Sequence, residues 1–165
     1  KICYVDWLQS HRKPEAQLCD WATSLQLDLS HFEIVIGGST YMRAMVQVLR
    51  GVISHDDVTP LASFDKQSSI IYAYIDGTWR ICADEDLRPL IDYLSNGISK
   101  LLDEWETANK ARLSKDDFHE QYARNMIKVM GPGLSYPEVC YQFRRALHDI
   151  VRLNLRNIVE YEFMA

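Results

Sequence analysis

The sequence predicts a mostly helical α+β fold, in which a β-hairpin and one or two short strands pack against about five amphipathic helices. Asp76-Gly77 lies between two runs rich in β-branched and aromatic residues, which is the strongest short-range signal of a hairpin. In five longer segments, apolar residues recur at the i, i+3, i+4 spacing of one helix face.

The 165 residues fit one compact domain, covering residues 1–165. Hydrophobic residues make up 47% of the chain and charged residues 25%, which is the composition of a globular protein. A domain of this size buries about 70% of its unfolded surface and therefore needs no disulfide or metal for stability. The first residue is Lys1, so we expect the domain to be part of a longer protein.

In the N-terminal half, residues 2–8 are apolar and fit either a strand or a helix. Pro14 suits the first turn of a helix over residues 15–25. The Phe-Glu-Ile-Val-Ile run at residues 32–36 predicts a short strand, which the following glycines end. A second amphipathic helix is expected over residues 40–53.

In the C-terminal half, the hairpin joins strands over residues 70–75 and 78–82. A long amphipathic helix follows over residues 84–105, with hardly a break in its apolar spacing. The last two helices are expected over residues 114–130 and 135–161. Each begins with a Ser-x-x-Asp or Ser-x-x-Glu pattern, which predicts a capping box.

The connection between the hairpin and the long helix is the dipeptide Ala83-Asp84. A link this short folds the helix back towards the hairpin. We therefore expect the indole of Trp79 to pack on the apolar face of that helix, formed by Leu87, Leu90, Ile91 and Leu94.

The charge and the cysteines limit the function classes. A net charge of −5 argues against a nucleic-acid-binding surface spread over the whole domain, although it allows a local basic stripe. No apolar run approaches the roughly 20 residues that span a bilayer, so we expect no membrane contact.

The four cysteines are scattered among apolar residues, and we expect reduced core thiols in an intracellular protein. They are Cys3, Cys19, Cys82 and Cys140.

No cofactor or metal motif is present. Cys3, His11, Cys19 and His31 follow one another in the sequence, but structural zinc sites need ligand pairs only two to five residues apart. We therefore expect no metal ion and no cofactor.

The Gly37-Gly38 pair, followed by Ser39 and Thr40, is the first candidate site. A glycine turn before a helix can hold an anion with its backbone N–H groups and the positive end of the helix dipole. The segment lacks the lysine of a P-loop and the three glycines of a dinucleotide fingerprint. A plain turn with Ser39 or Thr40 as the N-cap explains the same residues, and we favour it.

Catalysis has no local signature in the sequence. The acidic residues at 84–86 and 116–117 lie at helix starts, where carboxylates are favoured by the helix dipole. We interpret them as caps, and we expect no catalytic residue that the sequence alone can identify. Whether the chain is an enzyme is left open, with the balance against it.

A basic stripe on the last helix is the second candidate site. Arg145, His148, Arg152 and Arg156 follow at helical spacing, so they would share one face of a helix that continues to residue 161. The stripe could follow a phosphate backbone, pair with acidic residues of another subunit, or be a solvated outer face.

The order of features from Ile70 onwards forms a series: a hairpin ending in Asp-x-x-Trp, an amphipathic helix ending in Glu-Trp, a helix with a tyrosine, a glycine turn and a last helix. The residues are Ile71-Tyr72, Asp76-Gly77-Thr78-Trp79, Glu104-Trp105, Tyr122, Ile127, Met130-Gly131 and the helix after Pro137. This series, just over half of the chain, resembles a C-terminal module of giant-virus proteins. The family has no established enzyme activity. The resemblance implies a viral intracellular protein, in the host cytoplasm or the virion, with this module following other regions.

Three functions are compatible with the sequence. The first is a non-enzymatic interaction or oligomerisation module of a viral or virus-like intracellular protein, acting through self-association or a protein partner. The second is a nucleic-acid-associated domain that uses the basic stripe. The third is a small hydrolase or nuclease whose site forms only in the folded chain. We favour the first, because site motifs are missing and two long amphipathic helices are present.

Overall fold

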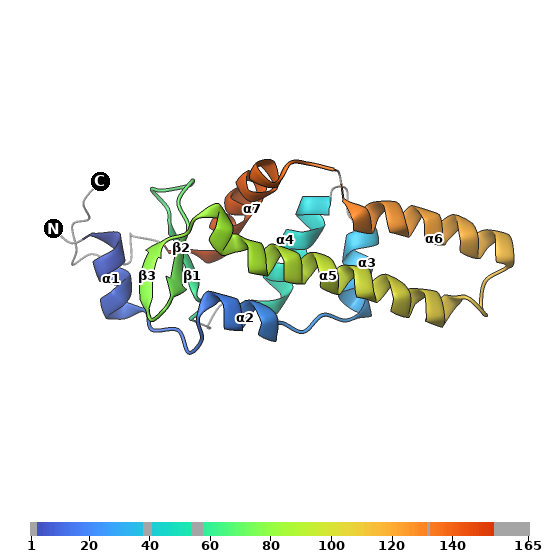
Figure 1. The fold of residues 1–165 in the computed structure, drawn as a ribbon, viewed down its shortest axis with the longest axis horizontal. Coiled ribbons are helices and arrows are strands. Elements are labelled where there is room, and N and C mark those ends of the chain that lie inside the picture. The colour runs from blue at the N-terminus through green and yellow to red at the C-terminus, as the bar shows by residue number, and fades with distance from the viewer. Residues whose placement is uncertain (1–2, 38–40, 54–57, 132, 154–165) are drawn as a thin grey trace.

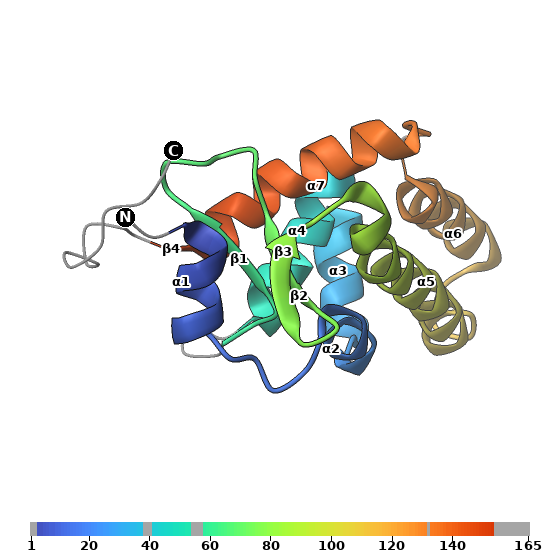
Figure 2. The same cartoon turned by 60° about the vertical axis from the view of Figure 1, so that its left-hand side comes forward.

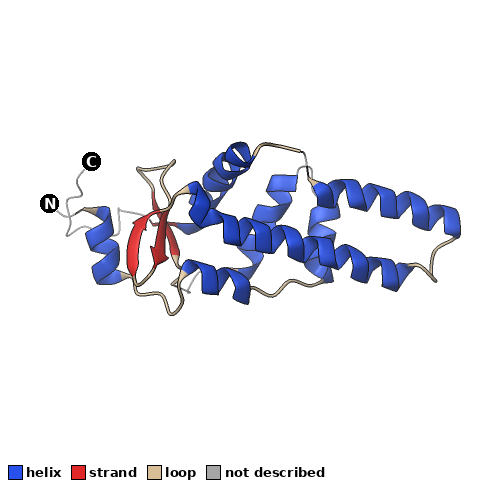
Figure 3. Cartoon of the chain, in the orientation of Figure 1, coloured by secondary structure: helices blue, strands red, loops and turns tan. Residues whose placement is uncertain are grey.

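A computed structural model of the chain describes residues 3–37, 41–53, 58–131 and 133–153. Within these residues, seven helices and a four-stranded mixed sheet confirm the mostly helical α+β class. The sheet lies near one end of the molecule, and two long antiparallel helices extend to the other end (Figures 1 and 3). The helices are α1 (Tyr4–His11), α2 (Leu18–Ser24), α3 (Leu29–Gly37), α4 (Tyr41–Val52), α5 (Asp84–Asn109), α6 (Lys115–Met130) and α7 (Tyr136–Val151). The strands are β1 (Leu61–Phe64), β2 (Tyr72–Ile75), β3 (Thr78–Ile81) and β4 (Arg152–Leu153).

The predicted hairpin is confirmed as strands β2 and β3. Tyr74 pairs with Trp79, and Ile75 pairs with Thr78 across the turn. The turn residues Asp76 and Gly77 have φ angles of 52° and 79°. Both angles are positive, as a type I′ turn requires, and this explains why Asp-Gly predicted the turn.

Strands β1 and β4 complete a sheet in the order β3-β2-β1-β4. β1 is antiparallel to β2, and β4 is parallel to β1. All four side chains of β1 are buried, because both faces of the strand are covered. Ala62 and Phe64 face α1, whereas Leu61 faces the main helical body. A strand covered on both faces shows no polar alternation, which is why the sequence did not predict β1.

The predicted strand over residues 32–36 is wrong, since these residues belong to helix α3. Phe32 and Val35, three residues apart, are buried together in the main core. Asp28 promotes the start of this helix, because its carboxylate accepts the backbone N–H of Ser30 at 2.9 Å. A short apolar run fits a buried helix as well as a strand, and here the tertiary packing selects the helix.

The last helix is shorter than the predicted range of 135–161. α7 ends at Val151, and Arg152 is extended with a ψ angle of 137°. The chain then forms β4, which pairs Ser63 with Arg152 and Phe64 with Leu153. The backbone N–H of Asp65 also donates to the Leu153 carbonyl. These bonds to β1 replace the helical ones, and residues 154–161 lie outside the described residues.

Two hydrophobic clusters hold the fold together on opposite faces of the sheet. The larger one surrounds α5, and its Leu90, Leu94 and Ile98 are fully buried. The smaller one is largely aromatic and joins α1 to the sheet. Figure 2 shows α1 on one side of the sheet and the other helices beyond it. Gly97 of α5 allows a close approach, because a Cβ there would lie 2.5 Å from Leu27 Cδ1.

Trp79 is buried, but the expectation that it packs on α5 is wrong. It lies in the smaller cluster with Trp7 and Leu8 of α1, and its indole N–H donates to the Arg12 carbonyl at 2.8 Å. Successive residues of a strand point to opposite faces of the sheet, and Trp79 points to the face that α1 covers. Leu87, Leu90, Ile91 and Leu94 of α5 belong instead to the larger cluster on the other face.

Candidate anion-binding groove

Helices α4 and α7 pack against each other beside the loop that joins β1 to β2. Between these three elements lies an open hollow of about 910 Å³, which we call the basic groove. Four arginines line it, together with neutral polar side chains and a single carboxylate, that of Asp149. The arginines are Arg43, Arg50, Arg144 and Arg145, and the neutral polar residues are Gln47, Gln142, Ser68 and Ser69.

Helical periodicity explains why these arginines share one hollow. In α4, Met42, Met45 and Leu49 are buried, so that Arg43 and Arg50, two turns apart, lie on the exposed side. In α7, the buried residues are Cys140, Phe143, Leu147, His148 and Val151. Arg144 and Arg145 lie beside that buried stripe and line the groove together with residues of α4.

The positive charge of the groove is only partly neutralised. Arg144 is fixed by Asp84 of α5, with Nη2 and Nε at 2.8 and 3.1 Å from Oδ1. The Arg145 guanidinium lies 5.8 Å from the centre of the Tyr141 ring. Neither Arg50 nor Arg145 forms an ion pair with a carboxylate of the described residues. Within the described part of the chain, no carboxylate neutralises these two charges.

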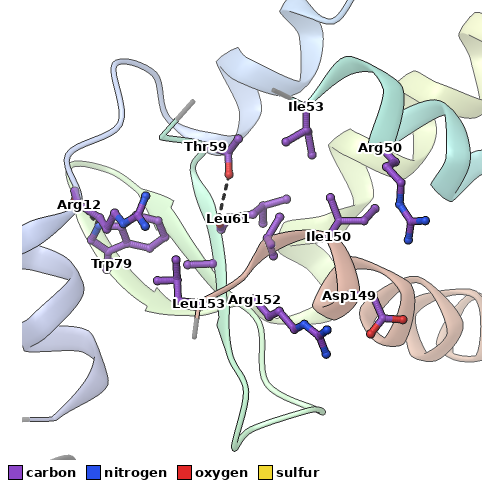
Figure 4. Close-up of a pocket in the computed structure, with 12 residues that line it drawn as sticks. Arg12, Arg50, Ile53, Thr59, Leu61, Trp79, Asp149, Ile150, Arg152 and Leu153 are labelled. Carbon is purple, nitrogen blue, oxygen red and sulfur yellow. Dashed lines mark hydrogen bonds between the residues drawn. The ribbon is translucent and has the colours of Figure 1, made fainter. Parts of the chain in front are cut away.

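A second, smaller hollow of about 210 Å³ shares two lining residues with the basic groove. Arg50 and Asp149 line both hollows, and Arg12 and Arg152 add further positive charge to the second one. Figure 4 shows Arg12 and Trp79 at one end of this hollow, with Arg50 and Asp149 at the other. Arg152 lies 3.8 Å from Asp65, an exposed and long ion pair. Six arginines thus line two hollows that share Arg50 and Asp149.

The predicted stripe along the last helix does not form as expected. Arg145 is exposed on α7 and lines the basic groove, but His148 is buried. Arg152 lies on β4 because the helix has already ended, and Arg156 lies outside the described residues. Of the predicted stripe, Arg145 is the exposed cation of α7 that lines the basic groove, and the sequence reasoning missed Arg43 and Arg50 of α4. Their distance along the chain gave no sign that α4 packs beside α7.

His148 forms a buried pair with Ser63 of β1. His148 Nδ1 lies 2.6 Å from Ser63 Oγ, and that hydroxyl donates to the Ile70 carbonyl at 3.0 Å. Because the serine has one proton to donate, His148 Nδ1 carries the proton shared with Ser63. Serine and histidine are a nucleophile and base combination, but Ser63 is 0% exposed. The pair therefore ties α7 to the sheet and offers no reactive hydroxyl to a substrate.

The glycine turn is placed only in part. Gly37 is the last residue of α3, and it is exposed. Gly38, Ser39 and Thr40 lie outside the described residues, so the predicted anion-binding turn stays a prediction.

The cysteines are free thiols, but they are not all in the core. Cys82 and Cys140 are buried, Cys3 is half-buried, and Cys19 is exposed, which corrects the expectation of four core thiols. Burial raises the pKa of the Cys82 thiol to about 12, so this group is a neutral thiol at pH 7. Among the described residues, no cluster of His, Cys, Asp and Glu side chains could hold a metal ion.

The acidic residues at the start of α5 have structural partners. Asp86 Oδ2 accepts the backbone N–H of Ala83 at 2.8 Å, and Asp86 Oδ1 accepts from Arg80 at 2.8 Å. Asp84 holds Arg144, as described above. These carboxylates stabilise the helix start and position an arginine of the groove, in agreement with their interpretation as capping residues.

A second surface feature lies on α6. Met126, Ile127 and Met130 are 37%, 71% and 76% exposed, and with Ala123 they form one stripe at helical spacing. The opposite side of α6, with Phe118 and Val129, is buried. Helix α6 therefore has two apolar faces: one packs in the core, and the other, this stripe, is exposed.

No protein-family model, curated protein or solved structure matches this chain significantly. Over the described residues, none of the helices combines the length and the apolar character needed to cross a lipid bilayer.

Proposed function

We propose that this chain is a non-enzymatic binding module whose basic groove holds an anionic partner. The observation that carries the proposal is the convergence of Arg43, Arg50, Arg144 and Arg145 on one hollow of a chain with a net charge of −5. Positive charge that is concentrated in a concave site attracts anions more strongly than the net charge would suggest.

The chemistry of the groove suits carboxylate or phosphate. An arginine guanidinium offers five N–H donors in a planar fork that matches two oxygens of either anion. Arg144 is already oriented by Asp84, and a side chain held in place loses less entropy when it binds a ligand. The alternative of a hydrolase or nuclease has weaker support, because Ser63 is buried and Asp84 and Asp86 are engaged with arginines.

Binding to immobilised heparin, a polyanion, tests the proposal. We expect the 165-residue chain to be retained at low salt, and the double variant Arg50→Gln/Arg145→Gln to elute earlier in a salt gradient. Each substitution removes one positive charge from the groove and keeps a polar side chain of similar length. The screening of exposed charges by salt makes the elution position a direct measure of their contribution.

The matched control is Lys100→Gln/Arg124→Gln, which removes two exposed charges from α5 and α6, away from the groove. This control should elute with the unmodified chain. Equal losses in the two double variants would contradict the proposal, because retention would then follow net charge and not the groove.

The resemblance to the giant-virus module extends the proposal to the biological setting. On that basis we propose that the binding module belongs to a viral intracellular protein, present in the host cytoplasm or the virion. The features that carry the resemblance are the β2–β3 hairpin and helices α5, α6 and α7.

Self-association is a second candidate function, favoured by the exposed stripe of Met126, Ile127 and Met130 on α6. A second copy presents the same stripe, so a two-fold pairing would bury apolar surface from both copies. We expect light scattering to show a dimer at high protein concentration and a monomer for Ile127→Glu. A monomer at every concentration would exclude this candidate and would leave the basic groove unaffected.

A further inference from the structure

We infer that the anionic partner of the basic groove is single-stranded nucleic acid, with phosphates on the arginines and a base stacked on Tyr141. The inference rests on the proposed function and makes it specific. Three observations support it: the extent of the basic surface, an exposed aromatic ring beside it, and the neutral polar side chains that line the groove with the arginines.

The basic surface is longer than a compact anion needs. Arg50 lines both the basic groove and the second hollow, and Arg12 and Arg152 also line the second hollow. A small anion would engage one or two of these guanidinium groups. A phosphodiester backbone repeats its charge along its length, so it can contact arginines of α4, α7 and β4 in turn.

Tyr141 supplies an exposed aromatic surface at this site. It is 61% exposed, and it is the one aromatic residue among the exposed large hydrophobic side chains of the described residues. It lines the basic groove, and the Arg145 guanidinium lies 5.8 Å from its ring centre. An aromatic ring beside a basic groove is how proteins hold single strands without sequence preference, because every base has a face that can stack.

The remaining lining favours a nucleotide over an acidic peptide. Gln47, Gln142, Ser68 and Ser69 add neutral donors and acceptors to the lining, and sugars and base edges carry groups that match them. Paired bases in a duplex keep their faces stacked on one another. Tyr141 would therefore discriminate in favour of an unpaired strand.

Fluorescence anisotropy with a labelled 20-nucleotide oligo(dT) tests the inference. We expect Tyr141→Ala to weaken binding about 5- to 100-fold, which is the range for the loss of one stacked base, whereas Tyr141→Phe keeps the affinity. We expect Arg50→Gln/Arg145→Gln to reduce the slope of log K against log salt by about 1.4, or about 0.7 for each lost phosphate contact. A duplex of the same length should bind more weakly than the single strand.

Labelled poly-glutamate of similar charge separates this inference from the proposed function. If poly-glutamate binds through Arg50 and Arg145 while oligo(dT) binds no better than the duplex and ignores Tyr141→Ala, the nucleic-acid inference is overturned and the anionic partner is a protein segment. If neither probe binds, or if the arginine variant binds both unchanged, the inference and the proposed function both fail. The Lys100→Gln/Arg124→Gln control should bind oligo(dT) like the unmodified chain.

Discussion

Trp79→Ala should lower the free energy of unfolding by about 3–5 kcal/mol, the range for removing a buried aromatic side chain. Trp79 is 3% exposed and joins the sheet to α1, the N-terminal helix. Its indole N–H also donates a hydrogen bond to the carbonyl of Arg12, the residue just after the end of that helix. In the Trp79→Ala variant we therefore expect amide hydrogen exchange to become faster in α1 than in the unmodified chain. Exchange in α5 should change less, because α5 packs in the other cluster.

Chemical denaturation of three variants checks this prediction. Trp79→Phe keeps most of the ring and loses the indole N–H, so it should cost about 1–2 kcal/mol. Tyr141→Ala removes an aromatic ring that is already exposed and should change stability by less than about 0.5 kcal/mol. A Trp79→Ala loss below about 1 kcal/mol, or unchanged exchange in α1, would show that α1 does not depend on this side chain.

Ser63→Ala should cost about 2–4 kcal/mol, although it removes a single oxygen atom. The substitution leaves the buried His148 Nδ1–H without its partner and also removes the hydrogen bond to the half-buried Ile70 carbonyl. Each unsatisfied buried group costs about 1–3 kcal/mol, because it has lost its hydrogen bonds to water and gains none in the protein. The free energy of unfolding from urea titrations measures this loss.

A double-mutant cycle shows whether the two side chains act as a pair. His148→Leu leaves Ser63 bonded to the Ile70 carbonyl and fills a similar volume. Ser63→Ala should therefore cost less in the His148→Leu background than in the unmodified chain, since no imidazole N–H is left unsatisfied. Additive losses, within about 0.5 kcal/mol, would mean that the Ser63–His148 hydrogen bond contributes nothing to stability.

The elements that the sequence predicted well are those determined by interactions between residues close together in the chain. The Asp76-Gly77 turn needs two positive φ angles, and few other dipeptides accept them. The predicted start of α6 at Ser114 is confirmed, because Ser114 Oγ accepts the backbone N–H of Asp117 at 3.2 Å. Helix α5 has one long apolar stripe, so its place in the core follows from its own periodicity. In each case, residues within a few positions of one another carry the signal.

Where the local sequence fits two conformations equally well, only the tertiary structure decided between them. The run at residues 32–36 is apolar in either conformation, and packing against α4 and α5 makes it helical. The chain after Val151 could continue as a helix, but the free edge of β1 offers hydrogen bonds at that position. Trp79 could have faced either side of the sheet, and the register with Tyr74 directs it to α1.

In the candidate site too, the sequence determined some features and the tertiary packing determined the others. By itself, the sequence determined that α7 carries adjacent arginines and that the chain is acidic overall. It could not determine that Arg43 and Arg50, about a hundred residues earlier in the chain, lie across a groove from Arg144 and Arg145. Helical spacing relates residues of one helix to one another, whereas the meeting of two helices depends on how their buried faces pack. The local elements were therefore readable from the sequence, and the groove came from the packing of α4 on α7.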